Sequence, residues 1–293
     1  MASSRRERFR ELVARPELLV LPGAYDALSA RIAETQGFQA ITAGGYAAVG
    51  SMLAQPDMGQ SNMRDYAAHY ARICQAVDVP VYVDADTGFG GVHNVRETVR
   101  AFEAAGIAGM FISDQVFPNR CGYLAGKSVI PQQEMVAKVR AAIDARQDPA
   151  FFICARTDAA AVEGVDAALD RCRAYLAAGA DSAKPQGLDT EAEIRRAIAE
   201  VPGPHFGTLS QAAGKGGLPL QALQALGVAA VTLPSLALFA AARAVSQAFS
   251  EFSKRGDVAG LQDKLMPLDQ YYELVRLQQF AERERAYLEP GGR

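Results

Sequence analysis

Short apolar runs alternate along the chain with longer segments in which apolar and polar residues repeat with helical periodicity. Eight of the short runs indicate buried strands, since they are bounded by turn residues and most are rich in β-branched or aromatic residues. They are LLVLP (18–22), QAITA (39–43), VPVYVDA (79–85), GMFIS (109–113), FFICA (151–155), DSAKP (181–185), HFGTL (205–209) and AAVTL (229–233). The amphipathic segments predict helices over 25–36, 62–77, 94–105, 132–146, 165–178, 190–200 and 218–226.

Regular alternation of strands and helices is typical of a parallel sheet, and eight such units at this length favour closure into a barrel. An open doubly wound sheet is the alternative, but it normally carries a glycine-rich fingerprint after its first strand, where this chain has PGAYDA. Further helices are predicted over 236–254 and, as one or two, over 260–288. We therefore expect an α/β fold, one (β/α)₈ barrel domain over residues 1–293, with 236–293 as a C-terminal helical extension.

Composition narrows the class of protein. The chain has 293 residues, 49% of them apolar, and a formal charge of −3 without a basic tract, so no nucleic acid or membrane partner is expected. The N-terminal MASSRRERFRELVARPE lacks the apolar core of a secretory signal. The four cysteines have no CxxC spacing. Together these features predict a cytoplasmic enzyme with free thiols.

The active site of such a barrel lies where its strands end, and one strand end is acidic. Asp84 and Asp86 end the third predicted strand and precede the glycine-bearing turn TGFGG. Carboxylates at this place suit Mg²⁺, which needs only one or two of them besides water and substrate oxygens. The alternative is that the two aspartates cap the next helix or pair with Arg156.

Two further strand ends carry candidate chemistry. The loop 117–127 is polar and cationic, as expected of a loop that closes over an anion, and Arg120 favours the thiolate of Cys121. The alternative is a surface loop with an incidental thiol. Arg156 ends the fifth strand and can bind a carboxylate through two hydrogen bonds, or form a salt bridge with Asp84, Asp86 or Asp158.

Several of these segments together resemble one family. They are PGAYDALSA, the glycine-containing turn over Ala43–Tyr46, PDMG (56–59), DADTGFG (84–90), DQVFPNRCGYLAGK (114–127) and ARTDA (155–159). This series resembles the isocitrate lyase/phosphoenolpyruvate mutase superfamily, and most closely its methylisocitrate lyase, dimethylmalate lyase and carboxyphosphonoenolpyruvate mutase branch. The resemblance covers the chain from about Glu11 to about Glu251.

The resemblance implies roles for particular residues. Asp84 would bind Mg²⁺ directly, Asp57 and Asp86 would hold its waters, and Cys121 would be the general acid. Arg156 would bind substrate. The expected substrate-binding set is completed by residues from the other loops and strand ends: Gly44, Gly45, Tyr46, Gly122, Tyr123, Gln186, Thr208 and Ser210. The family also implies a homotetramer whose C-terminal helices are swapped between subunits.

The chain departs from the family pattern at the site itself. Ser113 and Gln186 stand where the family commonly has Glu, and Lys184 where it has an apolar residue, so the barrel mouth is about three charge units more positive. Asn119 and Tyr123 replace Lys and His of the loop, Thr208 and Gln211 replace Asn and Glu, and Leu238 occupies the place of an arginine that serves tricarboxylates. These changes weaken a Mg²⁺ site and favour a more anionic ligand or a site that works without metal.

Lys184 shares strand parity with Gln186, so we expect both side chains to point into the barrel. Three roles are open for the lysine: an ion pair with Asp84 or Asp86, a cation in place of the metal, or a Schiff base with a carbonyl substrate. Lys184 is therefore counted with Cys121 and Arg156 among the predicted catalytic residues.

Three classes of function follow. The first is a carbon–carbon lyase acting on a small 2-hydroxy- or 2-oxo-dicarboxylate. The second is another reaction of the same barrel, phosphonomutase or oxaloacetate-type decarboxylase or hydrolase. The third is a repurposed or non-catalytic barrel that binds an anion in a rebuilt site, which the many substitutions motivate.

Overall fold

The computed structural model describes residues 4–120, 126–188, 190–210 and 217–288. It divides the chain into two compact units, Met1–Leu238 and Phe239–Arg293. The first unit contains all eight strands and the second contains only helices.

All eight predicted strands are confirmed within a few residues at their ends. They are β1 (Leu19–Pro22), β2 (Ile41–Ala43), β3 (Val81–Asp84), β4 (Gly109–Ser113), β5 (Phe152–Thr157), β6 (Ser182–Pro185), β7 (Phe206–Thr208) and β8 (Ala230–Leu233). They form two parallel sheets, in the orders β2-β3-β4-β5-β6 and β1-β8-β7. A parallel bridge between Gly23 and Thr42 joins β1 to β2, and the Lys184 side chain bonds Thr208 from β6 to β7. The (β/α)₈ barrel predicted from the alternation is therefore confirmed.

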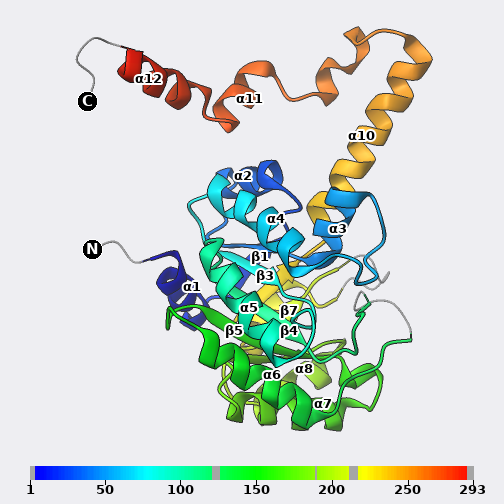
Figure 1. Cartoon of the computed structure of the whole chain (residues 1–293). Helices are drawn as coiled ribbons and strands as arrows, with labels where there is room; N and C mark the ends of the chain where they lie inside the picture. The colour runs from blue at the N-terminus through cyan, green and yellow to red at the C-terminus, as the bar shows by residue number, and fades with distance from the viewer. Residues whose placement is uncertain (1–3, 121–125, 189, 211–216, 289–293) are drawn as a thin grey trace. The chain divides into compact units, whose positions relative to one another are not determined.

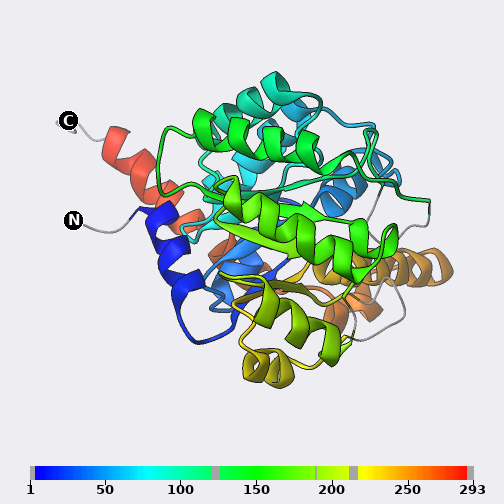
Figure 2. The same ribbon diagram turned by 90° about the horizontal axis from the view of Figure 1, so that it is seen from below.

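Helices surround the strands in the first unit, as Figures 1 and 2 show. Those that follow the strands are α2 (Ala27–Thr35), α4 (Met63–Ala76), α5 (Val92–Ala104), α6 (Gln132–Ala145), α7 (Val165–Ala177), α8 (Glu191–Glu200) and α9 (Leu220–Leu226). Each packs against the next around the barrel. A short 3₁₀ helix, η1 (Ala159–Ala161), follows β5.

Two helices were not predicted. The first, α1 (Arg5–Ala14), places Phe9 inside the N-terminal end of the barrel, where its ring stacks on Tyr82 and meets Phe152 edge-on. Arg6 and Arg10 of α1 pair with Asp148 and Asp181.

The second, α3 (Gly45–Leu53), begins where the sequence suggested only a glycine-containing turn over Ala43–Tyr46. Gly44 is its N-cap residue, so Gly45 and Tyr46 lie in its first turn. A helix N-terminus leaves backbone N–H groups without partners inside the helix, and that of Gly45 donates to Asp84 at the end of β3.

Helices occupy the described part of the range 236–293, for which the sequence predicted a C-terminal extension. Helix α10 (Leu236–Arg255) begins in the first unit and is followed by η3 (Ala259–Lys264), α11 (Leu268–Leu274) and α12 (Leu277–Leu288). The helices α10 and α12 carry exposed apolar side chains, such as Phe249 and Leu288. Among the residues described, no helix combines the length and apolarity needed to cross a bilayer.

Candidate active site

A cavity of about 90 Å³ lies at the C-terminal ends of the strands. Ten residues predicted to form the site line it: Gly44, Gly45, Tyr46, Asp57, Asp84, Asp86, Arg156, Lys184, Gln186 and Thr208. Ser210 is not in the cavity wall; its hydroxyl lies 3.4 Å from that of Ser235. Cys121, Gly122, Tyr123 and Gln211 lie outside the described residues.

Three carboxylates gather on one side of this cavity. The Asp84 carboxylate accepts backbone N–H bonds from Gly45 at 3.2 Å and from Asp86 at 2.8 Å. A Cβ on Gly45 would lie 3.2 Å from Asp84 Oδ2 and 3.5 Å from Asp57 Oδ2, so the glycine lets α3 approach both aspartates closely. The amide of Asn119, from the loop after β4, donates to Asp86.

The backbone conformation of the turn after β3 requires glycine at some of its positions. Asp86 has a positive φ of 53°, and its carbonyl accepts the N–H of Ser113 at 2.7 Å. At Gly88, with φ 79°, an added Cβ would lie 2.5 Å from Val95. The local sequence thus bends the chain sharply enough to aim Asp86 back toward the cavity.

Several oxygen atoms near the three carboxylates lack a hydrogen-bond donor among the described residues. Asp57 Oδ1, Asp86 Oδ2 and Asn119 Oδ1 are buried and have no partner among the described residues. Burial, then the nearby Asp84 charge, raises the pKa of Asp57 to about 6. Burial, then the charges of Asp84 and Asp57, likewise raises the pKa of Asp86. Buried oxygens of this kind call for a cation or for ordered water.

These oxygens fit Mg²⁺. No group of three His, Cys, Asp or Glu side chains in the described ranges forms a complete ligand set. Mg²⁺ does not require one, because it keeps several waters and binds one or two carboxylates. The Asp84 carboxylate could bind such an ion directly, and the unpaired oxygens of Asp57 and Asp86 could accept hydrogen bonds from its waters.

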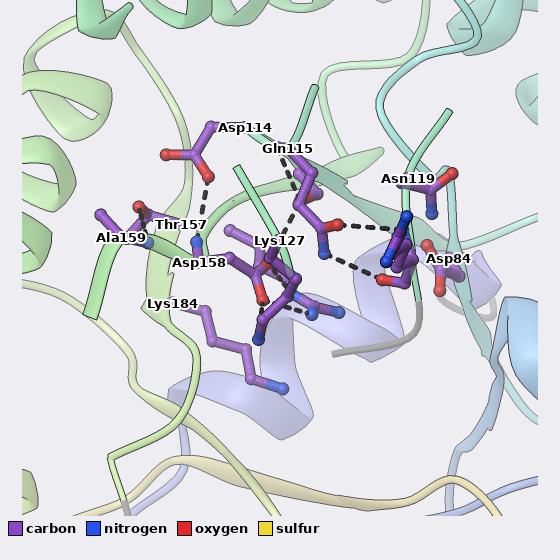
Figure 3. Close-up of polar contacts among 12 residues, drawn as sticks. Asp84, Asp114, Gln115, Asn119, Lys127, Thr157, Asp158, Ala159 and Lys184 are labelled. Carbon is purple, nitrogen blue, oxygen red and sulfur yellow. Dashed lines mark hydrogen bonds and ion pairs between the residues drawn. The ribbon is translucent and has the colours of Figure 1, made fainter. Parts of the chain in front are cut away.

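Three cationic residues also line the cavity: Arg120, Arg156 and Lys184. Arg156 forms two hydrogen bonds with Asp158, at 2.9 and 3.0 Å, which selects Asp158 from the three salt-bridge partners considered above. Lys127 and Ser113 also donate to Asp158, at 3.0 and 3.3 Å (Figure 3). Burial alone would raise the pKa of Asp158, but Arg156 and Lys127 outweigh burial and hold it at about 2.

A network behind the cavity, missed by the sequence analysis, fixes the end of β5. Asp114 accepts the N–H of Asp158 at 3.0 Å, the hydroxyl of Tyr175 at 2.8 Å and a guanidinium N–H of Arg171 at 3.3 Å. All of these groups are buried. Asp114 follows β4 directly, so its place at a strand end was the available signal.

Lys184 does not form the ion pair with Asp84 or Asp86 that was one of the three roles left open for it. Its Nζ donates to Thr208 Oγ1 at 2.5 Å, and within the described ranges it forms no salt bridge with Asp84, Asp86 or any other carboxylate. Burial, followed by the positive charge of Arg156, lowers its pKa to about 8. The expectation that Lys184 and Gln186 both face the barrel interior is confirmed, because both line the cavity.

The rest of the cavity wall contains residues to which the sequence assigned no binding or catalytic role. It includes Thr42, Phe111, Gln115, Thr232 and Asn119, the last noted only as a replacement for a Lys of the family loop. The side chain of Gln115 accepts the N–H of Arg120 and donates to its carbonyl, both at 3.0 Å, so it fastens the start of the loop after β4. Thr42 and Thr232 lie one or two residues before the strand-end positions considered in the sequence.

Comparison with known proteins places this geometry in one family. The family model described as phosphoenolpyruvate phosphomutase matches residues 9–253. The chain is 36% identical to the 2,3-dimethylmalate lyase of Eubacterium barkeri, over 96% of this chain and 97% of that protein. It is 39% identical to a probable 2-methylisocitrate lyase of Corynebacterium glutamicum, over 94% of this chain and 90% of that protein.

Solved structures agree. A structure of oxaloacetate acetylhydrolase with 3,3-difluorooxalacetate superposes with a TM-score of 0.92 at 28% identity, covering 98% of each chain. A crystal structure of 2,3-dimethylmalate lyase gives the same TM-score and identity, covering all of this chain and 99% of that one. The chain therefore belongs to the phosphoenolpyruvate mutase/isocitrate lyase superfamily, as the sequence motifs predicted.

Proposed function

We propose that this protein is a carbon–carbon lyase that cleaves a small 2-hydroxy- or 2-oxo-dicarboxylate. The observation that carries the proposal is the cavity itself, in which three carboxylates face Arg156 and Lys184. Near-full-length relatives that are 36 to 39% identical are named as lyases of this class. Leu238, in place of the arginine for tricarboxylates, favours a dicarboxylate over methylisocitrate.

Each side of the cavity has a task in this cleavage. Mg²⁺, held by Asp84 directly and by Asp57 and Asp86 through water, would stabilise negative charge on oxygen. Arg156, oriented by Asp158, would bind a carboxylate of the substrate. In a 2-hydroxy acid the hydroxyl gives its proton to water, its carbon becomes a carbonyl carbon as the adjacent carbon–carbon bond breaks, and the bonding electrons remain on the departing fragment. We assign Cys121 as the donor of the proton that this fragment takes up.

The direct test is a product assay. Purified enzyme with Mg²⁺ is offered 2,3-dimethylmalate, 2-methylisocitrate, oxaloacetate and phosphonopyruvate, and products are identified by mass spectrometry. The proposal expects pyruvate from 2,3-dimethylmalate, released together with propanoate. Failure to turn over any of the four, while oxalate and Mg²⁺ still raise the melting temperature, would favour the anion-binding barrel instead.

The second candidate is hydrolysis of oxaloacetate, because the chain superposes on oxaloacetate acetylhydrolase as well as it does on 2,3-dimethylmalate lyase, with a TM-score of 0.92 for each. In the same assay it gives oxalate and acetate. Phosphonomutase activity would instead give phosphoenolpyruvate from phosphonopyruvate.

Cys121→Ser tests the proton donor. Because a positioned acid contributes about 10²- to 10⁴-fold, we expect turnover to fall at least about a hundredfold while oxalate affinity stays the same. Unchanged turnover would remove Cys121 from the mechanism.

We also propose that the protein is a cytoplasmic homotetramer in which the C-terminal helices are exchanged between subunits. The exposed apolar side chains of α10 to α12 support a covered surface. Light scattering should give about four times the 31.2 kDa chain mass, and a monomer in solution would contradict it.

A further inference from the structure

Lys184 lines this cavity and forms no ion pair with a carboxylate among the described residues. Arg156 and Lys127 both contact Asp158, whereas Lys184 donates to a hydroxyl group and forms no salt bridge within the described ranges. Only 8% of the residue is exposed, so solvent compensates its charge poorly. A buried ammonium without a counter-ion is costly unless a ligand supplies one.

The hydrogen bonds around Lys184 have one direction. An ammonium can only donate, so Thr208 Oγ1 accepts from it at 2.5 Å. Thr232 Oγ1 lies 3.2 Å from that oxygen and donates to the carbonyl of Gly207 at 3.3 Å. The hydroxyl hydrogen of Thr208 is therefore directed to Thr232. Thr208 therefore holds the ammonium and Thr232 orients Thr208, and two of the three N–H groups of Lys184 have no partner among the described residues.

Lys184 and Asp84 lie on opposite sides of the cluster of polar residues, as Figure 3 shows. The lysine comes from β6, with Thr208 from β7 and Thr232 from β8, while the aspartate ends β3. Phe111 from β4 also lines the cavity and lies under the guanidinium of Arg156, 5.8 Å from ring centre to Cζ. The cavity thus has an acidic pole, a cationic pole on β6, and an aromatic ring in its wall.

We propose that Lys184, held by Thr208, is a subsite for the second acidic group of a dianionic substrate. The first acidic group and its 2-oxo or 2-hydroxy oxygen would lie toward Asp84, and the distal carboxylate would accept the two remaining N–H bonds of Lys184. This inference rests on the proposed function, and it names the substrate class: acids with an anionic tail, in preference to acids of the same length with an uncharged tail.

Two probes of equal chain length test the subsite. Calorimetry with Mg²⁺ would compare 3,3-difluorooxaloacetate, which has a charged tail, with 2-oxobutanoate, whose tail is a methyl group. In Lys184→Met the affinity for the first should fall about 10- to 100-fold, since a hydrogen bond to a charged group is lost, and the second should change less than about threefold. Lys184→Arg should keep most of the preference, and Thr208→Val should reduce it about threefold.

A third probe separates this inference from the proposed function. Oxalate with Mg²⁺ is too short to span both poles and reports the acidic pole alone. If wild-type protein binds neither oxalate nor the two 2-oxo acids, the proposed function fails, and the subsite with it. If oxalate binds but Lys184→Met weakens both 2-oxo acids equally, the subsite alone is wrong. A borohydride-stable adduct of 2-oxobutanoate on Lys184 would also overturn it, since the nitrogen would then form an imine with loss of water.

Discussion

The two ends of the barrel differ in how far their acidic side chains are paired. At the N-terminal end, Arg6 and Arg10 of α1 pair with aspartates and donate to backbone carbonyls, and Phe9 fills the space between the strands. At the C-terminal end, Asp57 and Asp86 keep oxygens that no described residue satisfies.

The difference separates stability from function within one fold. Satisfied ion pairs and a filled interior lower the energy of the native state, whereas unpaired buried carboxylates raise it unless a ligand is bound. Substitutions at the first end should therefore change stability without changing chemistry, and substitutions at the second should do the reverse.

The largest expected effect is a loss of stability at the N-terminal end of the barrel. Phe9→Ala removes a fully buried ring that contacts Tyr82 and Phe152, so the free energy of unfolding should fall by about 3–5 kcal/mol. Denaturant melts would measure it, with Arg8→Ala on the exposed face of the same helix as control, expected within about 0.5 kcal/mol. If the Phe9→Ala variant lost turnover at a temperature where it is still folded, the N-terminal end would contribute to activity, and the separation of stability from function would be wrong.

Next in size is the acidic pole. Asp84→Asn keeps the shape of the side chain but removes the charge expected to bind Mg²⁺, so turnover should fall at least about a hundredfold. The melting temperature should change little, because relief of repulsion among three buried carboxylates offsets the loss of one of the two backbone hydrogen bonds that Asp84 accepts. Asp144→Asn, on the outside of the barrel where the carboxylate pairs with Arg96, is the matched control and should keep full activity. A melting temperature that falls by many degrees in Asp84→Asn would instead assign the aspartate a structural role.

The smallest effect is a pH dependence of stability. The pKa of Asp57 is raised from 3.8 to about 6, so the native state holds this proton more tightly than the unfolded chain. The contribution is therefore favourable at low pH and is lost as the pH rises from about 4 through about 6. With chelator present, the difference in unfolding free energy between pH 4 and pH 7 should be smaller in Asp57→Asn by about 1–3 kcal/mol. An identical pH profile in wild type and variant would contradict the raised pKa.

The sequence predicted the barrel well for a physical reason. Strands of a parallel barrel are buried on both faces, so they appear as short continuous apolar runs, and the spacing between them leaves room for a helix. Helix α3 escaped prediction because Gly45 and Gly50 interrupt a segment that is apolar on all sides. Helix α1 escaped because its three buried residues lie among charged ones.

The site was predicted in position more than in its contacts. Strand ends located the cavity, and the family motifs named its carboxylates. The hydrogen bonds and ion pairs within the cavity depend on which side chains meet across the barrel, and the spacing of residues along the sequence does not determine this. Lys184 reaches Thr208, which is 24 residues further along the chain, instead of either aspartate. Arg156 pairs with Asp158, only two residues away, although the sequence left Asp84, Asp86 and Asp158 as equivalent partners.

Helix α1 also has a consequence for the order in which the molecule assembles. Phe9 is near the start of the chain, yet the aromatic cluster that receives it includes Phe152, and Phe206 of β7 completes that cluster by packing on Tyr82 and Phe152. Bringing such distant segments together is entropically costly, so α1 should dock after the strands have paired. Phe9→Ala should then accelerate unfolding and leave the refolding rate almost unchanged in stopped-flow measurements. Helix α1 would therefore be the last of these elements to dock.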